Sequence, residues 1–92
     1  MQQIAALTPE AIHDLVASDR ANLWHPFTRM QTFDPAERMI VKARDCYLWD
    51  AKGRRYFDAF AGLWSVNAGH NHPDIVEAIV EQVRELSVAP LF

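Results

Sequence analysis

The stretch that most constrains the fold of this chain is an apolar loop between an expected strand and an expected helix, residues 56–73, YFDAFAGLWSVNAGHNHP. Surface connections are usually polar, whereas this one places Leu63, Trp64 and Val66 between glycines. Large apolar side chains on a glycine-flanked loop usually face a pocket, a cofactor or another chain. The loop therefore indicates a segment that needs a further surface beside it.

Composition allows a small domain and excludes several classes of function. Half of the 92 residues are apolar, which is enough for a modest core. A net charge of −3 without any lysine or arginine block argues against nucleic-acid binding. The single cysteine, Cys46, excludes an internal disulfide framework and fits a reducing compartment. Because neither a secretory signal nor a membrane-length apolar run is visible, we expect a cytoplasmic protein without membrane contact.

The first third of the chain predicts one helix and one irregular segment. Residues 8–10, Thr-Pro-Glu, supply an N-cap hydroxyl, a proline at the first helical position and an acid in the first turn. Apolar side chains in residues 12–16 then follow helical spacing, and we expect the helix to end near Arg20. Residues 23–34 show no period, and Pro26 prevents a regular strand or helix there.

The remainder predicts a small sheet and a second helix. Residues 39–58 read as a hairpin or meander, because β-branched and aromatic residues flank a turn at residues 51–53. Residues 72–74, His-Pro-Asp, begin a helix whose apolar stripe runs over residues 75–86. We expect residues 87–92 to form a non-helical tail.

Two polar constellations invite a chemical reading. His70 and His72, with His25 recruited, could bind a metal, but zinc sites need three or four ligands on a fixed frame. We interpret His70 as hydrogen-bonded within its turn and His72 as the cap of the helix. Asp50 and Asp58 could form an acid–base pair across the hairpin, but we interpret both as turn residues without a neighbour that shifts their pKa.

The glycines and aromatic residues give weaker signals. The three glycines lie nine and seven residues apart, whereas a phosphate cradle needs clustered glycines at a helix N-terminus. We interpret Trp24 as a core or subunit-interface residue, and Phe27 as a packing residue. For Trp64 the residue pattern leaves two readings open: a core residue, or a rigid wall of a substrate pocket.

Three motifs together resemble the N-terminal portion of class III (ω-) aminotransferases. They are LWHPFT at residues 23–28, YLWDAKGRRYFDAFAGLW at residues 47–64, and NAGHNHPDIVEAIVEQ at residues 67–82. The resemblance implies an α+β N-terminal portion (helix, irregular segment, small antiparallel hairpin or meander, helix) of a pyridoxal-phosphate-dependent transferase of the aspartate-aminotransferase-like fold, fold type I. Residues 1–92 would contribute to the small domain and the active-site entrance, and the large cofactor-binding domain is absent from this stretch.

The likeness is strongest to ω-amino acid:pyruvate aminotransferases, in which Ala-Gly-Leu-Trp, Asn-Ala-Gly-His and a closing Ala-Pro-x-Phe form a typical run. In that family the residues that match Trp64, Leu63 and Phe27 line the substrate pocket. Those that match Leu91 and Phe92 approach the active site of the other subunit. The resemblance thus implies an amine donor, a keto-acid acceptor, and a homodimer or higher homo-oligomer.

The resemblance also implies which parts are missing. The cofactor is pyridoxal 5′-phosphate, and its Schiff-base lysine, its pyridine-binding aspartate and its phosphate loop would all lie beyond Phe92. Lys42 and Lys52 match neither the motif nor the position of the catalytic lysine. We therefore assign no catalytic, cofactor-binding or metal-binding residue to this stretch, and we expect the 92 residues alone to be inactive.

The chain departs from the family pattern at one position, and two alternative assignments fit it. Asp45 stands where the family usually has glycine, and aspartate tolerates positive φ, so we expect the turn to survive. The biotin-pathway aminotransferase, which makes a diaminononanoate with S-adenosylmethionine as donor, also carries Leu-Trp-His-Pro-Phe-Thr, but it generally has a Trp-Trp pair in place of Leu63 and Trp64. From another class, the chain could be a non-catalytic fragment or a small interaction module.

Overall fold

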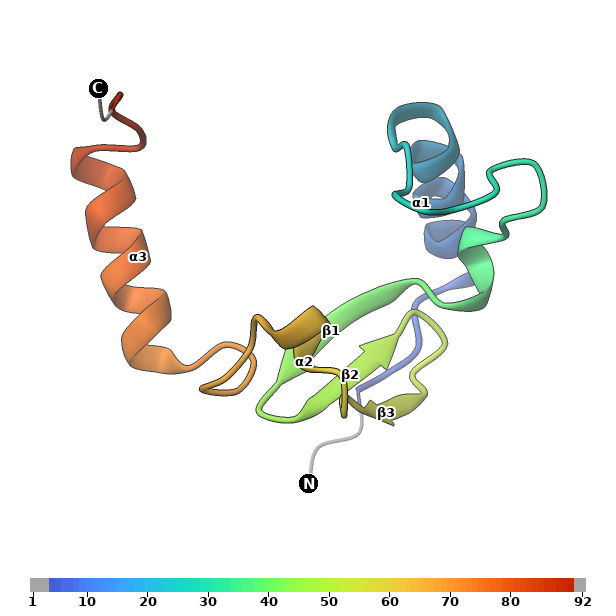
Figure 1. The fold of residues 1–92 in the computed structure, drawn as a ribbon. Helices are drawn as coiled ribbons and strands as arrows, with labels where there is room; N and C mark the ends of the chain where they lie inside the picture. The colour runs from blue at the N-terminus through green and yellow to red at the C-terminus, as the bar shows by residue number, and fades with distance from the viewer. Residues whose placement is uncertain (1–3, 91–92) are drawn as a thin grey trace. The chain divides into compact units, whose positions relative to one another are not determined.

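The computed structural model describes residues 4–90 and shows an α+β arrangement. The elements follow in chain order as α1 (Pro9–Asn22), the 3₁₀ turn η1 (Pro35–Glu37), β1 (Ile40–Arg44), β2 (Tyr47–Asp50), β3 (Arg55–Phe57), α2 (Ala61–Trp64) and α3 (Pro73–Glu85) (Figure 1). The described residues fall into two compact units. One is built from residues up to Lys42 with Leu48–Tyr56, and the other from Ala43–Tyr47 with residues from Phe57 onward.

Helix α1 begins where the sequence predicts. The Thr8 hydroxyl accepts the backbone N–H of Ala11 at 3.2 Å, and a proline follows the cap directly. The hydroxyl satisfies one of the N–H groups that the first turn leaves without a helical partner. The proline removes another, because it carries no N–H group. The helix continues to Asn22, two residues beyond the expected Arg20, and Leu23 closes it in extended conformation.

Strands β1, β2 and β3 form an antiparallel three-stranded meander in chain order, as the sequence predicts (Figure 1). Asp45 occupies the corner between β1 and β2 with φ of 52°, so the aspartate does adopt the left-handed conformation for which the family usually carries glycine. Gly53 turns the chain after β2 with φ of 79°. A Cβ at Gly53 would lie 3.2 Å from the carbonyl oxygen of Ile4, because the N-terminal segment passes directly against this turn.

A cluster of buried residues lies at the end of β2. Trp49 is 5% exposed, and Ala51 is buried beside it. Asp50 lies between them with 1% of its surface exposed, and its carboxylate accepts four hydrogen bonds: from the backbone N–H of Lys52 and of Arg54, from Arg54 Nε at 2.6 Å, and from the Tyr56 hydroxyl at 2.8 Å. A buried carboxylate this well satisfied ties the turn to both strands.

The expectation that no neighbour shifts the pKa of Asp50 is wrong. Burial opposes ionisation, but the hydrogen bonds from Arg54 and Tyr56 outweigh it and hold the pKa of Asp50 below its ordinary value. The same contact raises the pKa of Tyr56, because its hydroxyl proton is held by the Asp50 carboxylate. The network is therefore ionic and structural.

Helix α3 begins at Pro73, directly after His72, as the residue pattern predicts. His72 occupies the N-cap position, as expected. Its side chain makes no capping hydrogen bond, so the expectation that His72 caps the helix is right only in its position. The predicted apolar stripe is present and solvent-exposed; its exposed large residues are Ile75, Val76, Ile79, Val83 and Leu86. No helix in the described part of the chain has the length and apolar character needed to span a membrane.

Candidate functional site

Helix α2 is a single left-handed turn. Ala61, Gly62, Leu63 and Trp64 have φ of 49°, 57°, 66° and 64°. The backbone N–H groups of the next two residues donate to the Ala61 carbonyl at 2.9 and 3.1 Å, which closes the turn. A left-handed helical conformation costs roughly 1–2 kcal/mol for each residue that carries a Cβ. Strain of this kind persists where the surroundings fix the backbone, and it is frequent at ligand-binding segments.

The left-handed turn carries two exposed large apolar side chains, Leu63 and Trp64. Trp64 is 77% exposed and Leu63 is 61% exposed. The ring of Phe60 lies 6.3 Å from that of Trp64, centroid to centroid, at an angle of 51°. Within this unit Trp64 is thus supported from one side by an aromatic neighbour. Its role as a pocket wall stays a prediction.

Asp58 holds the start of the turn. Its Oδ1 accepts the N–H of Phe60 at 3.2 Å, and its Oδ2 accepts the N–H of Gly62 at 3.1 Å. His70 Nε2 lies 2.6 Å from the same Oδ2. The side chain of His70 is 17% exposed and that of Asp58 is 8% exposed. The sequence reading of Asp58 as a turn residue without a pKa-shifting neighbour is wrong on the second point. The hydrogen bond from His70, followed by those from the backbone, holds the pKa of Asp58 below its ordinary value despite its burial.

His70 is itself fixed through its backbone. It exchanges two hydrogen bonds with Asp45, at 2.7 and 3.0 Å, in an isolated antiparallel bridge. Gly69 precedes it with φ of 87°, and a Cβ there would lie 3.3 Å from the Asp45 Cα. Asn71 Nδ2 donates to the Ala43 carbonyl at 2.7 Å. The hydrogen bonds of His70 thus extend beyond its own turn, to the β1–β2 corner and to Asp58.

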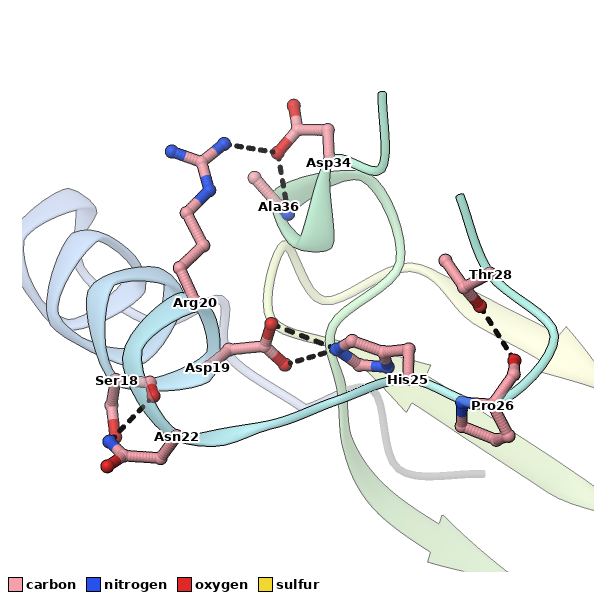
Figure 2. Close-up of polar contacts among 9 residues, drawn as sticks. All are labelled: Ser18, Asp19, Arg20, Asn22, His25, Pro26, Thr28, Asp34 and Ala36. Carbon is pink, nitrogen blue, oxygen red and sulfur yellow. Dashed lines mark hydrogen bonds and ion pairs between the residues drawn. The ribbon is translucent and has the colours of Figure 1, made fainter. Parts of the chain in front are cut away.

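A second aspartate–histidine pair lies beside Phe27, in the other unit of the chain. Figure 2 shows His25 Nε2 facing both carboxylate oxygens of Asp19 on α1, each at 3.0 Å. The Thr28 hydroxyl donates to the Pro26 carbonyl at 2.8 Å and so brackets Phe27. Phe27 has φ of 50° and is fully exposed. An exposed aromatic on left-handed backbone, next to an aspartate–histidine pair, therefore occurs in both units.

The irregular segment after α1 is also tethered near its far end. Arg20 on α1 lies 3.6 Å from an Asp34 carboxylate oxygen, and that oxygen accepts the N–H of Ala36 at 3.0 Å (Figure 2). Trp24, directly before His25, is 90% exposed, and Phe27, between the two tethers, is fully exposed. The described residues therefore provide no core around Trp24, and its expected place in a core or subunit interface stays a prediction.

The described residues form no evident binding site for a cofactor or a metal ion. No group of three metal-ligating side chains occurs in the described chain, so the histidine-based metal reading gains no support. Lys42 places Nζ 5.9 Å above the ring of Trp49, a cation–π contact within its own unit. The N–H groups of Phe60 and Gly62 and the imidazole of His70 already form hydrogen bonds with the Asp58 carboxylate. Leu91 and Phe92, expected at the partner's pocket, lie outside the described residues.

Comparison with known families decides the affiliation. The family described as aminotransferase class-III matches residues 29–91, which is more than half of the chain. The chain belongs to the class III aminotransferases. Among curated relatives, taurine–pyruvate aminotransferase of Rhodobacter capsulatus is 37% identical over 84 residues, which cover 89% of this chain and 18% of the relative. Adenosylmethionine-8-amino-7-oxononanoate aminotransferase of Aquifex aeolicus is 41% identical over 66 residues, covering 71% of this chain and 15% of the relative.

Solved class III structures share the arrangement described above. An (S)-enantioselective ω-transaminase from Thermomicrobium roseum aligns with a TM-score of 0.75 at 34% identity, over 97% of this chain and 20% of that one. A taurine:2-oxoglutarate aminotransferase from Bifidobacterium kashiwanohense, in complex with PLP and glutamate, aligns with a TM-score of 0.72 at 26% identity, over 100% of this chain and 19% of that one. The expected fold class is thereby confirmed. The chain spans less than a fifth of the length of these curated relatives.

Proposed function

We propose that these 92 residues form the N-terminal part of a pyridoxal-phosphate-dependent aminotransferase that transfers an amino group from an ω-amino acid or amine to pyruvate. The observation that carries the proposal is the class III match over residues 29–91. The taurine–pyruvate relative and the ω-transaminase neighbour support the substrate class. In the whole enzyme, residues 1–92 contribute to the small domain and to the entrance of the active site.

In this proposal the described residues shape the pocket. Pyridoxal phosphate, when bound, supplies the electron sink for breaking bonds at the amine carbon. Leu63 and Trp64 border the amine donor and exclude water from it. Phe27, in the other unit, is a further proposed substrate-binding residue, as the motif resemblance implies. Large apolar side chains that are exposed on fixed backbone suit such a wall, because they offer contact area without an ordering cost.

The residues that hold the cofactor are assigned to the remainder of the enzyme. The described chain shows neither a candidate Schiff-base lysine nor a phosphate cradle. Leu91 and Phe92 are proposed to reach the pocket of a second subunit in a homodimer or larger homo-oligomer. The closing Ala-Pro-x-Phe run, residues 89–92, supports this assignment.

A second candidate is the biotin-pathway enzyme. The Aquifex aeolicus relative, at 41% identity, keeps this candidate open. Leu63 favours the pyruvate-dependent enzyme, because the biotin-pathway aminotransferase generally carries tryptophan there. The proposed function thus predicts that the pocket wall accepts simple amines better than it accepts S-adenosylmethionine.

The test uses the full-length protein loaded with pyridoxal phosphate. With taurine or β-alanine as donor, we expect kcat/KM for pyruvate as acceptor to be higher than kcat/KM for 2-oxoglutarate as acceptor. Higher activity with S-adenosylmethionine and 8-amino-7-oxononanoate would move the assignment to the biotin pathway. Absence of transamination with every pair, in protein that binds the cofactor, would favour a non-catalytic role.

A further inference from the structure

Three residues with a Cβ, Ala61, Leu63 and Trp64, share one left-handed turn, and something outside the turn must hold them there. We propose that Asp58 and His70 are positioning residues that set donor specificity, because their contact locks this turn and thereby fixes where Leu63 and Trp64 stand. The inference rests on the proposed function, since it requires these two side chains to border the amine donor.

The turn's own hydrogen bonds do not select its handedness. Bonds from residues 65 and 66 to the Ala61 carbonyl are of a kind that a right-handed turn also forms. The contacts of Asp58 are more restrictive, because one carboxylate receives the N–H groups of Phe60 and Gly62, on either side of Ala61. Both oxygens are committed, so rotation of the carboxylate would break at least one of these bonds.

His70 prevents that rotation. The pKa of the carboxylate is lowered, so Asp58 is ionised and can only accept, and Nε2 of His70 must carry the proton it donates. The imidazole is attached to backbone that Asp45 fixes through two hydrogen bonds. The chain of contacts therefore runs from the β1–β2 corner through His70 and Asp58 to the turn. Neither Asp58 nor His70 needs to contact the donor.

Release of the carboxylate would redirect the wall without changing its residues. Side chains on left-handed backbone point in directions that the right-handed conformation does not reproduce. If the turn relaxes, Leu63 and Trp64 move together, and donors that differ in bulk are affected unequally. The proposal therefore predicts a loss of discrimination in place of a uniform loss of rate.

The experiment compares His70→Ala with His70→Gln in the full-length, cofactor-loaded enzyme. Glutamine can present a donor nitrogen near the position of Nε2, whereas alanine cannot. With pyruvate as acceptor, we expect the ratio of kcat/KM for 1-phenylethylamine to that for β-alanine to change roughly tenfold in His70→Ala, within the range for altered pocket contacts, and to be largely restored in His70→Gln. Asp50→Asn is the matched control, because it weakens a carboxylate network of the same sheet and should leave the ratio unchanged.

Hydrogen exchange of the same proteins reports the turn directly. We expect His70→Ala to speed exchange in a peptide covering residues 58–66 and to leave α3 unaffected. Unchanged exchange, or faster exchange with an unchanged substrate ratio, would overturn the positioning role while leaving the aminotransferase assignment intact. An inactive wild-type enzyme would instead refute the proposed function. Should His70→Ala fail to fold, Asp58→Asn, which keeps one acceptor oxygen, provides the same two readouts.

Discussion

At the scale of single residues, the chain keeps its large apolar side chains at the surface by means of its backbone. Leu63 and Trp64 are exposed because a left-handed turn holds them there, at a cost of roughly 1–2 kcal/mol each. Phe27 repeats the combination of positive φ and full exposure in the other unit. Large apolar residues, which a soluble domain would normally bury, are therefore held at the surface by a fixed backbone. The wall of a binding pocket needs residues held in this way.

Trp64→Ala tests whether the ring acts as a wall or as core. In the full-length enzyme we expect selectivity between one small and one bulky amine to change by roughly 10–200-fold, because truncation removes contact area from the bulky donor. Melting temperature should change little, since Trp64 is 77% exposed in its own unit.

Trp49→Ala is the control for that comparison. Trp49 is 5% exposed, so its truncation should cost about 3–5 kcal/mol of stability and reduce activity toward both amines alike. Were Trp64→Ala to behave as Trp49→Ala does, with a large fall in Tm and unchanged selectivity, Trp64 would leave the list of pocket residues.

Two glycines of the second unit should differ in their tolerance of alanine. Gly69 has φ of 87°, and its nearest neighbours would be backbone atoms of Asp45, the closest at 3.3 Å. Gly62 has φ of 57°, and its nearest neighbours are side-chain atoms of Val66 and Ser65, which can move. We therefore expect Gly69→Ala to lower Tm more than Gly62→Ala does. Gly62→Ala should lower the free energy of unfolding by about 1–2 kcal/mol. Equal losses would argue that the bridge between Asp45 and His70 is loose.

At the scale of elements, the helices and the meander could be predicted because their signals are local. Thr8 and the proline after it mark the start of α1, and the stripe that ends at Leu86 marks α3. The left-handed turn could not be predicted, because its anchor joins Asp58 to His70, twelve positions apart in the sequence. The pocket roles of Leu63, Trp64 and Phe27 are predictions from the motif resemblance alone.

The Asp50 network carried a signal that the sequence reading missed. Arg54 follows Asp50 by four residues and Tyr56 by six, so a turn at Gly53 brings both back to the carboxylate. Both side chains can donate hydrogen bonds, which is what a buried carboxylate needs. The reading of Asp50 as an ordinary turn residue gave no weight to these returning donors.

The lowered pKa of Asp50 predicts how acid affects this element. The ionised carboxylate stabilises the fold at all pH values above its ordinary pKa of 3.8, and that stabilisation is lost as the pH falls through the lower folded value. Asp50→Asn should therefore be less stable than wild type near neutrality, and the difference should shrink as the pH falls below about 4. Thermal melts of both proteins from pH 7 to pH 3 measure it. A difference independent of pH would show that the carboxylate charge contributes nothing.

At the scale of the whole molecule, the described chain covers too little of its own apolar surface. Trp49 and Ala51 are its buried apolar residues, while the α3 stripe from Ile75 to Leu86 is exposed. Exposed apolar area of this extent marks a surface that meets another one. In the proposed enzyme, that surface is supplied by the remaining length that its relatives have.

The 92 residues expressed alone should therefore associate or aggregate and lack transaminase activity. Light scattering and a thermal melt followed by circular dichroism measure the first, and a pyruvate-coupled amine assay measures the second. A monomer with a single cooperative transition would contradict the prediction and favour a self-contained interaction module.

The left-handed turn also decides which sequences directed evolution can explore at this wall. A library that randomises Leu63 and Trp64 samples side chains on a backbone that accepts glycine, asparagine and aspartate readily and resists β-branched residues. Active clones should thus be depleted in valine, isoleucine and threonine at both positions, whatever the amine used for selection. A broader substrate range would require that the contact between Asp58 and His70 is weakened first. Selection would then act on the backbone conformation of residues 61–64, and not only on the volumes of the side chains at positions 63 and 64.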